Sequence, residues 1–265
     1  VIKENKITHL TLPMAAYLLQ QVIATRKAQQ RPKLVFATVF PYSCHFYQLR
    51  DWLASANITD RDVDIIVVPP ANMVAHLQSS EIDGCCVGGP WNAKAVRAGT
   101  GLTALTSFDI WQDSPEKVLG LLESWYKVNP NTVLALTAAL KQACIWLESI
   151  PNRFEAARLL SAECYLDASV DVIAPSLIGS CLTHISMPPR AIPSYNQFSK
   201  SNNGSINIPE YVRGEWLMSQ MHNAGQLAGI DIPPDLVKRV FRPDIYHQMR
   251  LTLEDQKVQF FRHSG

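Results

Sequence analysis

Three positions in this sequence offer hydrogen-bond donors, positive charge or close approach to the backbone, which are the features that suit a small anion. His45 stands where a β-rich run ends and a helical pattern begins, and an imidazole donates one hydrogen bond when neutral and two when protonated. Gly88 lies in a second strand-to-helix turn, where the missing side chain lets the backbone approach a ligand closely. Lys117 follows Ser114-Pro115-Glu116 and carries a compact cationic head.

Each of these residues also has an ordinary structural interpretation. A histidine at the start of a helix is more often a cap or a surface residue than a ligand contact. The turn at Gly88 is equally compatible with a simple tight turn that places Trp91 in the core. A lysine taken alone is usually a solvated surface residue. The residue types therefore leave both interpretations open.

Catalytic motifs are scarce in this sequence. It contains no P-loop, no nucleophile elbow, no H-E-x-x-H pair and no Rossmann glycine fingerprint. Three acids, Asp62, Asp64 and Asp83, are scattered without a partner suggested by their spacing. The six cysteines form no C-x-x-C pair. We therefore predict a binding protein that is not an enzyme and that uses neither a metal nor another cofactor.

The elements that must position these residues follow a regular order. Continuous apolar runs, typical of strands, alternate with helical patterns at 33–40, 63–68, 82–87 and 102–105. This order predicts a mainly parallel sheet covered by helices on both faces. The carboxyl ends of parallel strands share one edge, where helix N-termini present unpaired N–H groups and partial positive charge to small anions. From about residue 115 the patterns are helical, at 129–146, 154–160, 170–178, 211–226 and 234–240, with an irregular connection at 187–210.

The composition narrows the class of protein. The 265 residues are 47% hydrophobic and 18% charged with a formal net charge of +1, so direct binding of nucleic acid is not expected. No apolar run approaches the ~20 residues of a membrane-spanning helix. The sequence begins at Val1 rather than Met, from which we expect that the true N-terminus is missing. Six cysteines that read as free thiols favour a reducing compartment.

Several spaced motifs occur in a specific order. They occupy residues 36–45, 67–74, 83–92, 114–120, 129–132 and 216–221. Together they resemble the nitrate-binding family of ABC-transporter solute-binding proteins. The resemblance runs through most of residues 33–185, fades in the irregular segment and returns at 216–221.

The resemblance implies an α/β fold of the periplasmic-binding-protein-like type II, with the ligand between two lobes. It assigns 33–108 to the second lobe, and 1–32 with 109–265 to the remaining part of an incomplete first lobe and the C-terminal helices. It also implies that His45, the backbone of Gly88 and Lys117 contact an oxyanion, with nitrate or nitrite as the ligand. One departure is Gly89, which stands where the family usually has glutamate.

Residues 37–45 and 241–246 look closest to the family's cytoplasmic nitrate and nitrite sensors, which restrain an RNA-binding antiterminator until ligand arrives. This branch implies a cytoplasmic sensor with a regulator protein as partner. The main alternative is a periplasmic or membrane-associated substrate-binding subunit of an ABC transporter for nitrate, bicarbonate or alkylsulfonate, with membrane subunits as partners. A regulatory domain attached to a transporter ATPase is a third possibility. An enzyme related to thiamine-pyrimidine synthases is a fourth.

Overall fold

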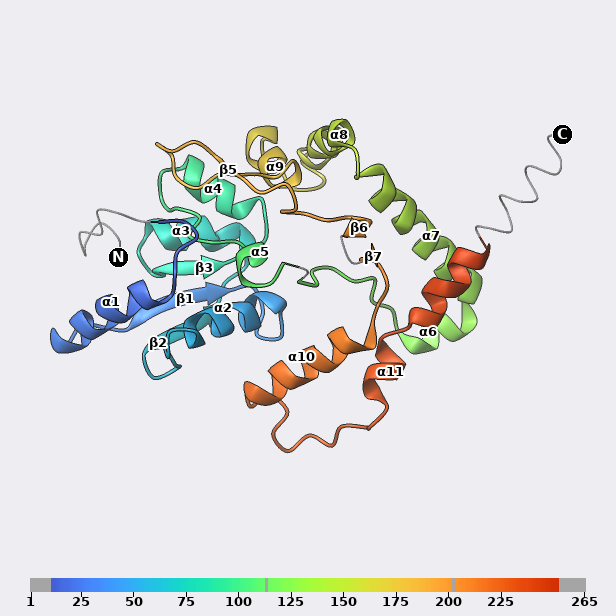
Figure 1. Ribbon diagram of the computed structural model, residues 1–265, viewed down its shortest axis with the longest axis horizontal. Coiled ribbons are helices and arrows are strands. Elements are labelled where there is room, and N and C mark those ends of the chain that lie inside the picture. Colours follow the sequence, from blue (N-terminus) through green and yellow to red (C-terminus); the bar gives the residue numbers. More distant parts are fainter. Residues whose placement is uncertain (1–10, 113, 202–203, 253–265) are drawn as a thin grey trace. The chain divides into compact units, whose positions relative to one another are not determined.

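The computed structural model describes residues 11–112, 114–201 and 204–252, which divide into two compact units (Figure 1). Unit 1 comprises Val1–Ser114 and Arg153–Asn196, and unit 2 comprises Pro115–Asn152 and Gln197–Gly265. The predicted second lobe, 33–108, falls wholly within unit 1, and its assignment to a lobe stays a prediction. Residues 1–10, the start of the segment predicted for the first lobe, lie outside the described residues.

Unit 1 is built on a three-stranded parallel sheet in the order β2-β1-β3. The strands are β1 (Leu34–Thr38), β2 (Val63–Val67) and β3 (Gly84–Cys86). Thr38, the last residue of the central strand, lies opposite Val67 on one side and Cys86 on the other. All three carboxyl ends therefore meet at one edge of the sheet. This arrangement confirms the predicted α/β class and the predicted parallel pairing.

A helix follows each strand, as the sequence predicts. β1 leads into α2 (Cys44–Ala54), β2 into the 3₁₀ turn η1 (Pro70–Asn72) and α3 (Met73–Gln78), and β3 into α4 (Trp91–Arg97). Since parallel neighbours need a crossover connection, these helices return the chain to the opposite end of the sheet.

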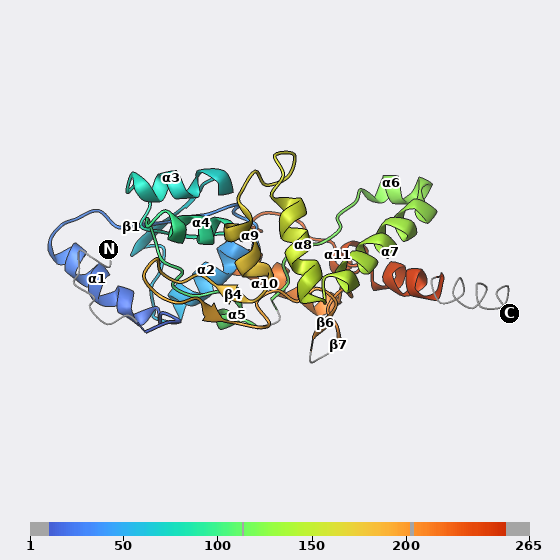
Figure 2. The same cartoon turned by 90° about the horizontal axis from the view of Figure 1, so that it is seen from above.

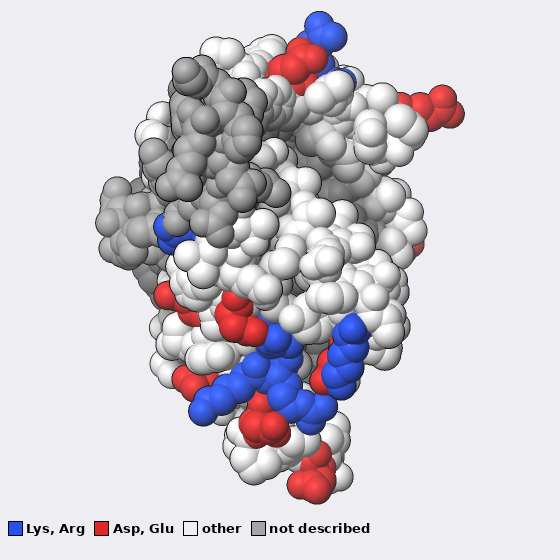
Figure 3. Space-filling view, turned by 90° about the vertical axis from the view of Figure 1, so that its right-hand side faces the viewer, with Lys and Arg blue, Asp and Glu red and all other residues white. Residues whose placement is uncertain are grey.

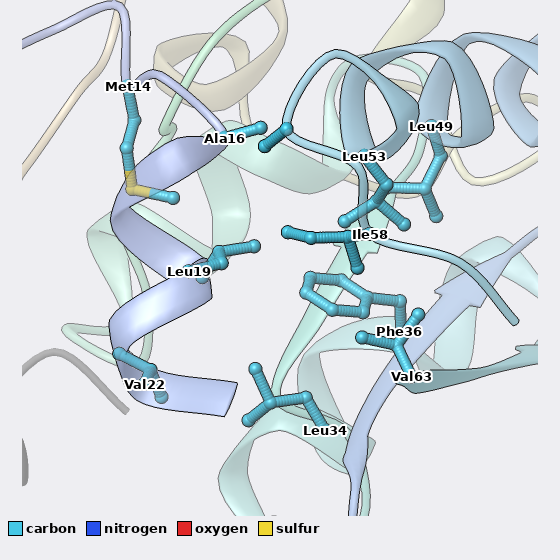
Figure 4. Close-up of a cluster of buried hydrophobic side chains, with 11 residues drawn as sticks. Met14, Ala16, Leu19, Val22, Leu34, Phe36, Leu49, Leu53, Ile58 and Val63 are labelled. Atoms are coloured by element: carbon cyan, nitrogen blue, oxygen red, sulfur yellow. The ribbon is translucent and has the colours of Figure 1, made fainter. Parts of the chain in front are cut away.

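The central strand is buried on both faces because its residues alternate between two clusters. Leu34 and Phe36 pack with Leu19 of α1 (Tyr17–Ala28) and with the α2 residues Leu49 and Leu53 (Figure 4). The opposite face carries a second cluster formed by Ala37, Val68, Met73 and Ile82. Burial of one such leucine contributes about 2 kcal/mol. The prediction of a sheet covered on both faces is confirmed.

The prediction of a fourth strand at 102–105 is wrong. This segment forms no strand and pairs with none of the three strands of the sheet. The Thr103 N–H donates to the Thr183 carbonyl at 2.9 Å, and the Ala104 carbonyl accepts from the Met14 N–H at 2.8 Å. Its backbone groups are thus satisfied by two connecting segments instead of a sheet neighbour.

Unit 1 also contains α5 (Ser107–Ile110), α9 (Val170–Leu177) and most of α8 (Ile150–Leu160), whose first turn lies in unit 2. The antiparallel pair β4 (Ser180–Cys181) and β5 (Arg190–Ala191) completes it. α9 lies beside α4 (Figure 2). A third apolar cluster joins them, formed by Ala93, Val96, Ala157, Val172, Ile173, Ala174 and Leu182. The predicted helices at 154–160 and 170–178 are confirmed.

Unit 2 is mainly helical, with α6 (Glu123–Val128), α7 (Pro130–Trp146), α10 (Tyr211–Asn223), α11 (Leu236–Val240) and a helical run at 243–252. The predicted irregular segment contributes only two-residue strands, among them β6 (Lys200–Ser201) and β7 (Gly204–Ser205). The Lys141 ammonium of α7 donates to the Ser199 hydroxyl and to the Asn207 side-chain carbonyl, both at 2.8 Å. This lysine therefore holds the irregular segment against α7.

The charges on the face drawn in Figure 3 are mixed in sign, and most of its described surface carries no Lys, Arg, Asp or Glu. Lys and Arg side chains gather on the lower part of this face, with Asp and Glu side chains among and beside them (Figure 3). Within the described ranges no single helix is long and apolar enough to span a bilayer, and only the broken pair α7 and α8 meets both criteria when taken together.

Candidate functional site

His45 lies in the first turn of α2, directly after the loop that leaves β1. Ser43 is the N-cap of this helix, and its hydroxyl accepts from the Phe46 N–H at 3.3 Å and donates to the Phe40 carbonyl at 2.7 Å. These two bonds fix both the loop and the entry of the chain into the helix. The His45 side chain is only 7% exposed, so the interpretation as a surface residue is wrong.

The turn after β3 brings Gly88 to the same edge of the sheet. A Cβ atom built on Gly88 lies 3.9 Å from both Cε1 and Nε2 of His45, so the imidazole faces the Gly88 backbone. Gly88 and Trp91 both keep part of their surface in solvent, and the Lys94 ammonium stands 5.3 Å from the centre of the Trp91 ring. The turn is therefore not closed by a core tryptophan. The structure thus brings together two of the three predicted ligand-binding residues, His45 and Gly88.

The electrostatics of this edge favour a negative charge. The 11-residue helix α2 points its N-terminus at the edge, and a helix N-terminus carries about half a unit of positive charge. No acidic residue occupies the first turn of α2 or of α4. The His45 ring adds hydrogen-bond donors next to this positive end.

Three buried polar atoms on the elements around this edge have no hydrogen-bond partner in the part of the chain that the structure describes. They are Oγ1 of Thr38, Oε1 of Gln48 and Oδ1 of Asn92. Thr38 ends β1, Gln48 follows His45 by one helical turn, and Asn92 lies in the first turn of α4. An unsatisfied buried polar group costs about 1–3 kcal/mol, so polar occupants such as water are expected here. The sequence motif contained Asn92, but spacing alone did not single out Thr38 or Gln48.

An exposed aromatic pair borders the loop that leads to His45. The rings of Phe40 and Tyr42 lie with their centres 5.6 Å apart, and both side chains are largely exposed, as is Val67 at the end of β2. Exposed apolar side chains gathered beside polar groups are typical of interaction sites. The sequence offered one signal for this pair, two aromatic residues on either side of Pro41 directly after a strand.

Lys117 belongs to unit 2 and lies in an irregular segment before α6. Its side chain is 83% exposed, and its ammonium pairs with the Glu116 carboxylate at 2.5 Å. Its predicted contact with the ligand therefore stays a prediction.

The glycine at position 89 is explained by its neighbour on α9. A Cβ atom built there lies 3.0 Å from the Ser176 hydroxyl oxygen and 3.3 Å from the Ser176 Cβ. Both distances are tighter than ordinary van der Waals contact. A glutamate, which the family resemblance expects at this position, requires either Ser176 or the turn to move.

Asp109 and Arg190 form a partly buried ion pair elsewhere in unit 1. The Arg190 guanidinium donates to both carboxylate oxygens of Asp109, with 3.0 Å between Nη1 and Oδ2. The N–H and the hydroxyl of Thr106 donate to the same carboxylate at 2.8 and 3.0 Å. Burial raises the pKa of Asp109, but the hydrogen bonds from Arg190 and Thr106 outweigh burial and hold this pKa below its usual value. The pair fastens β5 to the start of α5.

Metal-ligating side chains and cysteines are scattered over the described residues. Within the described ranges no group of three or more His, Cys, Asp or Glu side chains is placed to hold a metal ion. All six cysteines are free, and burial raises the pKa of the Cys85 and Cys181 thiols to about 11. Such thiols stay protonated near neutral pH and are poor nucleophiles.

Comparison with known proteins identifies relatives of this chain. The profile of the NMT1-like family matches residues 3–161. The nitrate import ATP-binding protein NrtC of Synechocystis sp. is 35% identical over 212 residues, which are 78% of this chain and 31% of NrtC. The nitrate/nitrite binding protein NrtA of Synechococcus elongatus is 36% identical over 160 residues, which are 60% of this chain and 36% of NrtA.

A solved structure extends this similarity to the fold. The periplasmic nitrate-binding protein NrtA from Synechocystis superimposes with a TM-score of 0.82 and 26% identity, covering 91% of this chain and 61% of that chain. The predicted periplasmic-binding-protein-like fold and the predicted resemblance to nitrate-binding ABC-transporter proteins are confirmed. The chain spans about a third of the length of the curated relatives named above. These relatives are named as binding or transport proteins.

The prediction of a cytoplasmic location is wrong, because the solved relative is a periplasmic protein. The prediction rested on the resemblance of residues 37–45 and 241–246 to the cytoplasmic sensors, with the free thiols as additional support. Burial keeps thiols such as Cys85 and Cys181 protonated and unreactive, so free cysteines of this kind do not require a reducing compartment.

Proposed function

Because this chain belongs to the NMT1-like family, we propose that it binds a small oxyanion, nitrate or nitrite, as part of an ABC import system. The observation that carries this proposal is the His45 imidazole facing the Gly88 backbone at the carboxyl edge of the sheet. It is supported by the positive end of α2 and by the nitrate-binding relatives.

The proposed mechanism is capture without chemical change. Nitrate is a planar monoanion whose oxygens only accept hydrogen bonds, so the site needs donors and positive charge. In this proposal His45 supplies a ring N–H and Gly88 supplies room for close approach to the backbone. The family resemblance adds Lys117, which carries a compact positive charge. We propose that the protein acts through occupancy of this site by the anion, without catalysis, as its relatives named as binding and transport proteins suggest.

We further propose that the partners are the subunits of the transporter. The relatives include both a nitrate/nitrite binding protein and an ATP-binding protein of nitrate import. The antiterminator partner expected from the sequence is set aside, because it depends on a cytoplasmic location.

A second candidate is a ligand-sensing domain within a transporter ATP-binding protein. The similarity to NrtC supports it, since the match takes in 78% of this chain but only 31% of NrtC. The two candidates predict different behaviour. A ligand-sensing domain changes the ATP hydrolysis rate of its own polypeptide when nitrate is added, whereas a separate receptor does so only through the assembled transporter.

The first test is the loss of nitrate binding in the His45→Ala variant. Removing a donor to a charged ligand is expected to weaken nitrate binding about tenfold or more. Isothermal titration calorimetry on the full polypeptide measures the dissociation constant, and circular dichroism verifies folding. His184→Ala, which removes an imidazole from the segment after β4, is the control and should bind as the wild type does. Equal affinity of the two variants contradicts the assignment of His45.

The second test concerns Lys117 by itself. Lys117→Gln is expected to weaken nitrate binding about tenfold, because it removes a positive charge from the proposed contact set. Lys127→Gln is a matched control, since Lys127 is also an exposed lysine of unit 2 paired with a nearby glutamate, Glu123, at 3.0 Å. If both substitutions change the affinity equally, Lys117 acts only through the overall charge of unit 2.

A further inference from the structure

The two glycines of the turn after β3 face different partners. A Cβ atom built on Gly88 lies 3.9 Å from Cε1 and Nε2 of the His45 ring. A Cβ atom built on Gly89 lies 3.0 Å from the hydroxyl oxygen and 3.3 Å from the Cβ atom of Ser176, which belongs to α9. One residue of the turn is thus close to α2 and the next is close to α9, while Gly89 keeps an exposed side.

α9 is held in place at the end that carries Ser176. The Arg153 guanidinium, whose residue is 6% exposed, donates to the Leu177 carbonyl at 2.9 Å and to the Asn196 carbonyl at 3.3 Å. The Asn196 amide donates to the Ser176 carbonyl at 2.8 Å. Since the last carbonyls of a helix lack intrahelical partners, these bonds satisfy them and fix the helix end.

The Ser176 hydroxyl donates within its own helix. Its donor goes to the Ile173 carbonyl at 3.2 Å. Ile173 itself is buried in the cluster that joins α9 to α4. Ser176 thus presents a fixed surface to Gly89 instead of a mobile hydrogen-bonding group.

We propose that Ser176 is a positioning residue, whose side chain blocks movement of the glycine turn away from His45 and so sets the spacing between His45 and Gly88. The expected effect on nitrate binding rests on the proposed function, whereas the role of Ser176 in the spacing rests on the geometry alone. A methyl group added at residue 89 is crowded against the Ser176 side chain, on a helix end anchored by Arg153 and Asn196. We therefore expect the turn, and Gly88 with it, to give by a few tenths of an ångström. Removal of the Ser176 side chain leaves space for that methyl group, so the turn can keep its wild-type position.

The experiment compares Gly89→Ala, Ser176→Gly and the double variant in the full polypeptide. The first readout is the NMR signal of the His45 ring without ligand. The second is the dissociation constant of nitrate measured by calorimetry. Gly89→Ala is expected to move the His45 signal and to weaken nitrate binding about tenfold, the effect of misplacing one donor to a charged ligand.

The double variant is the decisive one, because its new methyl group occupies the space left by Ser176. It is expected to return the His45 signal towards the wild-type position and the affinity to within about threefold of the wild type. Gly101→Ala is the control, since a Cβ there meets Ala95 and Leu77 only at 3.9 Å. It should change neither readout.

Two results overturn the proposal. One is that Gly89→Ala leaves the NMR signal of the His45 ring unchanged. The other is that the double variant folds but returns neither the His45 signal nor the nitrate affinity towards the wild-type values. If Gly89→Ala does not fold, Ser176→Gly decides, because removal of the blocking side chain alone must shift the His45 signal. If the wild type binds no nitrate, the proposed function fails, while the NMR comparison still decides the role of Ser176.

Discussion

The Gly88→Ala variant is expected to lose nitrate binding while it unfolds at the same temperature as the wild type. The added methyl group lies 3.9 Å from the Cε1 and Nε2 atoms of His45, which is ordinary van der Waals contact, so the fold accommodates it. The same methyl group fills the space between the imidazole and the backbone in which the anion is proposed to lie. Loss of two donors to a charged ligand corresponds to a decrease in affinity of about a hundredfold or more.

Calorimetric titration with nitrate and a thermal unfolding scan measure the two halves of this prediction. Gly101→Ala is closely matched, because its Cβ also meets two atoms at 3.9 Å, but on the side chains of Ala95 and Leu77. This control should keep both the affinity and the unfolding temperature. Wild-type affinity in Gly88→Ala would place the anion elsewhere and remove the central support of the proposed function.

The second large effect is on stability, through the Asp109–Arg190 ion pair. Asp109→Asn leaves the guanidinium without its carboxylate in a site where the Asp109 side chain is only 8% exposed. Breaking a fully buried pair costs 3–5 kcal/mol. Because Arg190 keeps 26% of its side-chain surface in solvent, we expect a smaller loss of about 2 kcal/mol in the free energy of unfolding at neutral pH.

This loss should depend on pH in a defined direction. The pKa of Asp109 is lower in the folded protein than in the unfolded chain, so its contribution to stability is complete above the unfolded value of about 4 and decreases as the pH falls through the folded value. Urea titrations at pH 7 and pH 3 should therefore show a smaller difference between wild type and Asp109→Asn at the lower pH. Asp171→Asn is the control, since the exposed pair of Asp171 with Arg97 at 3.6 Å contributes less than about 1 kcal/mol. A pH-independent difference contradicts the assigned role of the carboxylate.

The fold of unit 1 was largely predictable because its signals are local. Apolar runs that end in Pro41 or Gly88 mark the strands, and amphipathic patterns after them mark the helices. Parallel pairing then places the carboxyl ends of β1 and β3 at one edge, which is why His45 and Gly88 could be expected to meet.

Contacts that depend on pairing between distant segments were not predictable. The apolar run 102–105 has the composition of a strand, but its hydrogen bonds go to Met14 and Thr183, and periodicity carries no information about partners. Asp109 and Arg190 are 81 residues apart in the sequence. Ser176 is likewise invisible from the glycine turn that it touches. The sequence therefore predicted that His45 and Gly88 lie close together, but it did not predict the contact of Ser176 with the glycine turn.

Unit 1 is assembled from two stretches of chain, Val1–Ser114 and Arg153–Asn196, with residues 115–152 between them. A gene fragment that stops at Ser114 encodes β1, β2, β3 and both His45 and Gly88, yet it omits α9 together with Arg153 and Asn196. The encoded fragment retains His45 and Gly88 but lacks Ser176, the α9 residue next to Gly89. A fragment meant to keep the surroundings of His45 and Gly88 thus requires a spliced design in which the second stretch, Arg153–Asn196, is kept.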